Sequence, residues 1–158
     1  MDWSALGERE LLKAYCSLMT ELRQRGVVRS SNNPVADYTE TLVSEALGLS
    51  LGSPSQAGYD AVDARGLRYQ IKGRRLTSHN KSTQLSALRN LGQKPFDVLA
   101  AVAFSEDLSI AYGALVPVDV VGDLSRYSQH SNSHIFMFRQ NVLSHPKVTD
   151  ITMALRSI

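Results

Sequence analysis

The feature that most constrains the fold is a continuous apolar run, DVLAAVAF, at residues 97 to 104. Strands that are covered on both faces of a sheet read as nearly unbroken apolar runs, whereas half-exposed strands alternate apolar and polar residues. The run is far shorter than the ~20 apolar residues that a membrane-spanning helix needs. We therefore predict a buried central strand with a packed layer on each of its faces.

The segments before this strand predict two helices and several short strands. Leucines and other apolar residues recur at helical spacing between residues 4 and 25, so we expect an amphipathic accessory helix that covers the fold, with Cys16 packed beside its stripe. A second helix is expected to begin after Asn33 and Pro34 and to end at Gly48. Residues 49–51 form a possible strand, and residues 59–63 and 67–72 form a hairpin joined by residues 64–66.

Beyond the hairpin, a further helix is expected from about Ser82 to Gly92, followed by the buried strand and a neighbouring strand at residues 110–116. The order helix, short strands, helix, strand favours an α/β or α+β domain with a mixed sheet. A length of 158 residues fits a single domain, 1–158, which we divide into an accessory N-terminal helix at 1–30, a core at 33–117 and a C-terminal extension at 118–158.

The cysteine content and the N-terminal sequence indicate the cellular compartment of the protein. One cysteine cannot form an internal disulfide, and the N-terminus lacks the basic start and apolar core of a signal peptide. We expect a cytoplasmic protein that has no membrane association.

Charge is unevenly distributed along the chain. Residues 64–96 contain no Asp or Glu but hold eight of the 17 Lys and Arg residues, which leaves nine basic against 15 acidic residues in the remainder. A local excess of positive charge suits contact with a polyanion such as DNA, because phosphate contacts depend on local rather than total charge. A solvated basic face with no ligand explains the charge equally well.

The hairpin carries polar residues in a pattern that suits phosphodiester chemistry. Strand alternation places Gln70 and Lys72 on one face, and a cross-strand position for Asp60 would complete a cluster there. Carboxylate and amide oxygens are ligands for Mg²⁺, and a lysine can stabilise charge on a phosphate. A third oxygen ligand would come from the preceding helix, where helix geometry alone leaves Glu40 and Glu45 as alternatives.

This pattern, a helix glutamate in YTETLVSEALG, then GYD, then QIK, resembles the PD-(D/E)xK nuclease superfamily, also called restriction-endonuclease-like. The resemblance implies an α/β three-layer core of helix, three strands, helix and strand. It also implies that Asp60 is the central metal ligand, that Lys72 is the catalytic lysine and that Glu40 is the helix acid. Gln70 stands where most relatives have Asp or Glu, although Mrr-type nucleases are similar in carrying QxK.

The function that the resemblance implies is Mg²⁺- or Mn²⁺-dependent hydrolysis of DNA, in a restriction or repair context. A homodimer or a restriction-system partner is expected if both strands are cut. The alternative is an inactive nuclease-fold module that binds nucleic acid or assembles with a nuclease partner. In either case the expected nucleic-acid-binding residues come from the basic strand and the helix after it: Arg68, Arg74, Arg75, Lys81, Ser82, Thr83, Gln84 and Arg89.

Overall fold

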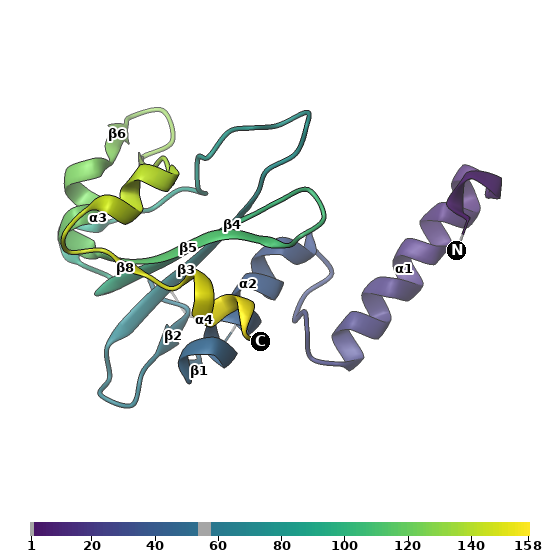
Figure 1. Cartoon of the computed structure of the whole chain (residues 1–158), viewed down its shortest axis with the longest axis horizontal. Helices are drawn as coiled ribbons and strands as arrows, with labels where there is room; N and C mark the ends of the chain where they lie inside the picture. The colour runs from purple at the N-terminus through teal and green to yellow at the C-terminus, as the bar shows by residue number, and fades with distance from the viewer. Residues whose placement is uncertain (1, 54–57) are drawn as a thin grey trace.

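The chain folds around one mixed six-stranded sheet, as seen in a computed structural model that describes residues 2–53 and 58–158 (Figure 1). The strand order is β1-β2-β3-β4-β5-β8, in which β3 and β4 are parallel and the other neighbours are antiparallel. The strands are β1 (Ser50–Leu51), β2 (Ala61–Val62), β3 (Arg68–Arg75), β4 (Val98–Phe104), β5 (Ile110–Pro117) and β8 (Thr149–Asp150). This arrangement confirms an α/β protein with a mixed sheet.

Strand β4 is the centre of the core, as its apolar sequence predicts. Leu99, Ala101 and Ala103 belong to one buried cluster, whereas Ala100, Val102 and Phe104 belong to another on the opposite face. Each face is therefore covered by its own layer. Burying apolar area on both sides stabilises the strand by about 25 cal/mol per Å².

Helices α2 (Pro34–Leu47) and α4 (Thr152–Arg156) lie on one face of the sheet, and α3 (Val118–Leu124) lies on the other (Figure 1). Helix α2 begins and ends as predicted. The side chain of Asn33 accepts a hydrogen bond from the N–H of Val35 at 3.1 Å, and Gly48 adopts the left-handed conformation, with φ of 64°. Its buried apolar residues, Leu42 and Val43, pack on β3 and β4.

The helix predicted from Ser82 to Gly92 is wrong. This segment is irregular and ends in a 3₁₀ turn (Leu91–Gln93). Its backbone pairs instead with a small hairpin of β6 (Arg126–Ser128) and β7 (Ser133–Ile135) and with the residues that follow it: the N–H of Leu88 donates to His134 of β7 at 3.2 Å, and that of Leu85 to Phe136 just after it at 3.0 Å. Serine and asparagine, frequent in this segment, favour such non-helical bonding.

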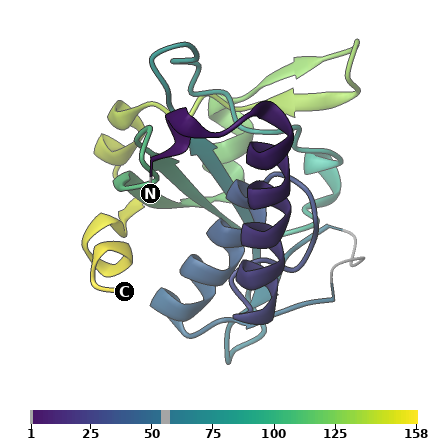
Figure 2. The ribbon, with the colours of Figure 1, turned by 90° about the vertical axis from the view of Figure 1, so that its right-hand side faces the viewer.

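Helix α1 (Glu8–Gln24), preceded by a 3₁₀ turn (Trp3–Ala5), forms where it was predicted but does not cover the fold. It extends away from the sheet in Figure 1, and in Figure 2, where this side of the molecule faces the viewer, it lies in front of the rest of the fold. Among its residues Met19 alone is fully buried. The expectation that Cys16 packs beside an internal stripe is also wrong, because this cysteine is exposed. An amphipathic pattern predicts an apolar face but does not identify what covers it.

Candidate active site at the β2–β3 hairpin

The carboxylate of Asp60 is fixed at the start of the β2–β3 hairpin. The N–H of Asp60 donates to the carbonyl of Tyr69 at 2.8 Å, which sets the cross-strand register. One carboxylate oxygen, Oδ2, then accepts a hydrogen bond from the N–H of Ile71 at 2.6 Å and another from the side-chain amide of Gln70. The hairpin thus brings together the acid and the amide that the sequence places ten residues apart.

Lys72 belongs to the same group by strand alternation, since it lies two residues after Gln70 on β3. Its positive charge lowers the pKa of Asp60, as do the hydrogen bonds from Ile71 and Gln70, but burial has the largest effect and raises that pKa above its ordinary value. Within residues 2–53 and 58–158, Lys72 has no hydrogen bond or ion pair.

Of the two candidate helix acids, Glu40 is the one that the structure brings toward Asp60. Burial raises the pKa of Glu40, and the negative charge of Asp60 raises it further. Glu45 is exposed, on a part of α2 that faces solvent. The position of α2 on the sheet therefore places Glu40, rather than Glu45, on the side of the hairpin.

Sequence reasoning missed Arg29, whose guanidinium pairs with Glu40 through Nη2 and donates to the carbonyl of Gly52 through Nη1 at 2.9 Å. The loop that carries it is attached to α2: the N–H groups of Arg29 and Ser30 donate to Asp37 at 2.8 and 2.6 Å. No local signal identifies such a residue, because its role depends on where the loop folds back.

The side chains present suit a divalent cation of the hard, oxygen-binding type. Among the described residues no cluster of three or more His, Cys, Asp and Glu occurs, but Mg²⁺ keeps several waters and takes only one or two protein carboxylates. Asp60 and Glu40 supply two half-buried carboxylates, and burial raises the pKa of each. Arg29 pairs with Glu40, whereas the hydrogen bonds to Asp60 come from the neutral donors Ile71 and Gln70. The amide oxygen of Gln70 is the third candidate ligand.

The basic residues expected to bind nucleic acid fall into two groups. Three of them are already engaged: Arg68 pairs with Asp97 at 2.9 Å, Arg74 donates to the carbonyl of Ser82 at 2.7 Å, and Arg75 donates to that of Glu106 at 2.7 Å. Lys81 and Arg89 are exposed and have no hydrogen bond or ion pair in the part of the chain that the structure describes. These two cations, with Lys72, are therefore available to phosphate.

Two hollows lie between β3 of the hairpin and the irregular segment that replaces the expected helix. The first, of about 360 Å³, has Gln70 and Arg89 in its wall together with Asn90 and Phe96. The second, of about 440 Å³, adjoins the next part of β3 and is largely polar. Its lining includes Ser82 and Gln84, two of the residues expected to bind nucleic acid, whereas Thr83 is half-buried between them.

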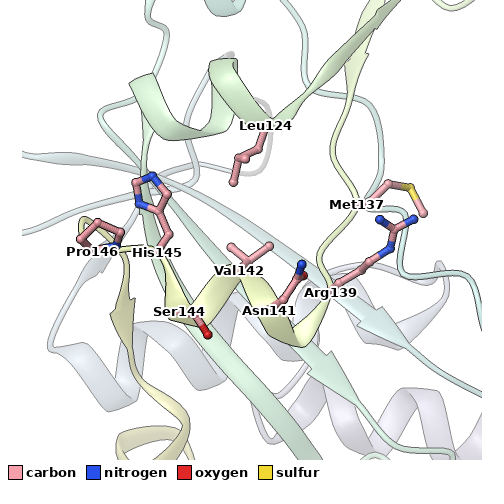
Figure 3. Close-up of a pocket in the computed structure, with 8 residues that line it drawn as sticks. All are labelled: Leu124, Met137, Arg139, Asn141, Val142, Ser144, His145 and Pro146. Carbon is pink, nitrogen blue, oxygen red and sulfur yellow. The ribbon is translucent and has the colours of Figure 1, made fainter.

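A further hollow of about 500 Å³ lies away from this hairpin and contains none of the candidate site residues. Figure 3 shows Met137 and Arg139 on one side of it and His145 and Pro146 on the other. Its lining has no carboxylate, so it lacks the hard anionic ligands that Mg²⁺ prefers. The lining residues are Leu124, Met137, Arg139, Asn141, Val142, Ser144, His145 and Pro146.

Comparison with known proteins does not assign the chain to a family. No family model matches the sequence, and no curated protein matches it either. Within the described residues, no helix is both long enough and apolar enough to cross a membrane.

Replacing Arg29 with glutamine is expected to lower the stability of the metal-free protein by about 1–3 kcal/mol, because it leaves the half-buried Glu40 without its cation. The side chains of this pair are only 26% and 17% exposed. Thermal unfolding in EDTA measures the loss, and added Mn²⁺ is expected to reduce it. Lys94→Gln is the matched control, since its pair with Asp119 is 62% and 63% exposed and such pairs contribute ~0–1 kcal/mol. Equal losses in the two variants would contradict a special role for Arg29.

Proposed function

We propose that this protein is a divalent-metal-dependent DNA endonuclease with a restriction-endonuclease-like core, acting in the cytoplasm in a restriction or repair setting. The observation that carries the proposal is the fixed carboxylate of Asp60, which is held by the N–H of Ile71 and bonded to Gln70, with Lys72 and Glu40 nearby. The packing of α2 on the sheet and the parallel β3–β4 pair support such a core, although the helix that it has between these two strands is replaced here by an irregular segment.

In this proposal the side chains of the site have two roles, metal binding and stabilisation of the reacting phosphate. Asp60, Glu40 and Gln70 hold the Mg²⁺ or Mn²⁺ ion, which when bound polarises the scissile phosphate and lowers the pKa of a coordinated water. Lys72 orients the attacking water and stabilises the negative charge that develops on the phosphate. Gln70, being neutral, leaves the site less anionic than one with a third carboxylate, so we expect weaker metal binding.

Incubation with supercoiled plasmid tests this function. Nicking is expected in Mg²⁺ or Mn²⁺, none is expected in EDTA, and Asp60→Asn should remove the activity because it removes the charge that holds the ion. Activity that persists in EDTA or in Asp60→Asn would contradict the proposal. Linear product at early times would indicate coordinated cutting of both strands, which requires two sites in one particle.

The second candidate function is a nucleic-acid-binding module without catalysis. It is favoured by the contacts of the two carboxylates, because Arg29 already compensates Glu40 and the amide of Gln70 already donates to Asp60. A module of this kind would bind DNA with a steep salt dependence and would not cleave it in any metal. The plasmid assay and a binding titration together separate the two functions.

DNA binding is expected to depend on the two free cations beside the hairpin. Reversing both charges, Lys81→Glu with Arg89→Glu, should weaken binding at least tenfold and reduce the slope of log affinity against log salt by about 2, one for each lost phosphate contact. Fluorescence anisotropy with labelled duplex at several salt concentrations measures both quantities. Arg65→Glu is the control, because this exposed residue pairs with Asp63 at the hairpin tip. An unchanged salt slope in the double variant would place the DNA on another face.

A further inference from the structure

Helix α1 and the turn before it expose an unusual amount of apolar surface. Leu12, Leu18 and Tyr15 are 66%, 56% and 48% exposed, and Trp3 at the N-terminal end is 50% exposed. In Figure 1 the N-terminal turns of this helix lie well clear of the sheet. A contiguous apolar surface of this kind marks a contact with another molecule.

The spacing of the exposed residues is that of a seam between two helices. Leu11, Tyr15, Leu18 and Leu22 follow one another at intervals of four, three and four, which is the a/d pattern of a heptad repeat. A membrane surface is a poor occupant for this face, because residues 2–25 contain four acidic and four basic residues and so have no excess of positive charge for anionic lipid.

We propose that α1 binds α1 of a second copy of this chain in an antiparallel pair. With the two-fold axis midway between Cys16 and Ser17, Leu11 faces Leu22 of the second copy and Tyr15 faces Leu18. The same register places Glu8 opposite Arg25, at both ends of the seam. In a parallel pair, Glu8 would lie beside Glu8 of the second copy and Arg25 beside Arg25, and like charges at such close positions repel.

An apolar hollow at the C-terminal end of α1 supports the antiparallel direction. It has a volume of about 450 Å³, and Leu22, Val27, Val28, Pro34 and Tyr38 form most of its wall. In the antiparallel pair, the N-terminal turn of the second copy reaches this end of the helix. Trp3 and Leu6, which precede the helix, then lie near Val27 and the hollow, so each copy fills a cavity of the other.

The size of the contact is adequate for a specific dimer. Six large apolar side chains are at least 38% exposed in this region, namely Trp3, Leu6, Leu11, Leu12, Tyr15 and Leu18. Two copies would cover twelve such side chains, which is of the scale needed for the ~1,000 Å² of a specific interface. This inference does not rest on the proposed nuclease activity, although such a pair would place two hairpin sites in one particle.

Light scattering coupled to size-exclusion chromatography tests the dimer directly. The wild-type chain is expected to elute at twice its mass of 17.4 kDa at tens of micromolar, whereas Leu18→Glu should elute as a monomer. Ser17→Glu, an exposed substitution on the opposite side of the helix, is the matched control and should remain dimeric. A wild-type protein that stays monomeric, or a dimer that Leu18→Glu leaves intact, would overturn the proposal.

The fluorescence emission of Trp3, the single tryptophan, is a second measure of dimerisation. Trp3 should shift its emission to shorter wavelength as concentration rises through the dimerisation range, and Leu18→Glu should abolish the shift.

A thiol-reactive bifunctional cross-linker tests whether the two helices are antiparallel. It should join Cys16 of one copy to Cys16 of the other, because both lie near the two-fold axis. It should not join copies of the variant Arg9→Cys with Cys16→Ser, in which the cysteine is moved to position 9. Cross-linking at both positions would indicate a parallel pair and overturn the antiparallel arrangement.

Discussion

Lys72→Ala is expected to lower the rate of metal-dependent plasmid nicking by about 10²–10³-fold, the usual cost of removing a group that stabilises transition-state charge. The reason is the position of the ammonium group. Burial raises the pKa of Asp60, and the charge of Lys72 acts against that increase, while Lys72 has no hydrogen bond or ion pair within the described residues. A lysine so placed near a buried carboxylate contributes charge to the site rather than packing to the fold. The loss should appear in the cleavage step at saturating DNA.

Two further variants and a stability measurement test whether the loss of nicking is specific to the charge of Lys72. Lys147→Ala, which removes an exposed lysine from the C-terminal part of the chain, should leave the rate unchanged. Lys72→Arg should restore part of it, because the charge remains while the geometry changes. The thermal stability of Lys72→Ala should match that of wild type. A variant that is as active as wild type would remove Lys72 from the mechanism, and an unstable one would indicate a structural role instead.

The parts of the fold that the sequence predicts are those with strong local signals. The apolar run at β4 requires a layer on each face, and the structure has both. Helix α2 begins at Asn33 and Pro34 and ends at Gly48, because a cap, a fixed φ and a left-handed residue act over one turn of chain. The hairpin follows in the same way, but local signals do not fix its register, and it is the register seen in the structure that brings Asp60 to Gln70.

The parts that were missed depend on contacts between distant segments. Leu85 and Leu88 have helical spacing, yet their backbone N–H groups bond to Phe136 and His134, about 50 residues further on, and this pairing replaces the expected helix. Arg29 reaches Glu40 only because Asp37 holds the intervening loop. Neither interaction leaves a pattern in a short window of sequence.

The close approach of α2 to β3 at Gly73 leads to the largest expected effect on stability. A Cβ atom at this position would lie 2.0 Å from Oγ1 of Thr39 and 3.2 Å from the ring of Phe104. Thr39 is fully buried, and its hydroxyl donates to the carbonyl of Val35 at 2.5 Å, so it has little freedom to turn away. Helix α2 must therefore move if any side chain is added to β3 here.

Gly73→Ala is accordingly expected to lower the free energy of unfolding by about 3 kcal/mol, at the upper end of the usual cost of overpacking, as measured by urea denaturation. Gly122→Ala is the control, because nothing lies within 4 Å of a Cβ added there and alanine favours the helix. Thr39→Ala should recover part of the loss in the double variant, since it removes the nearest atom. Because Glu40 follows Thr39 on α2, the same displacement of the helix should reduce metal-dependent nicking. A Gly73→Ala protein with wild-type stability would show that α2 does not pack this closely on β3, the strand that carries Gln70 and Lys72.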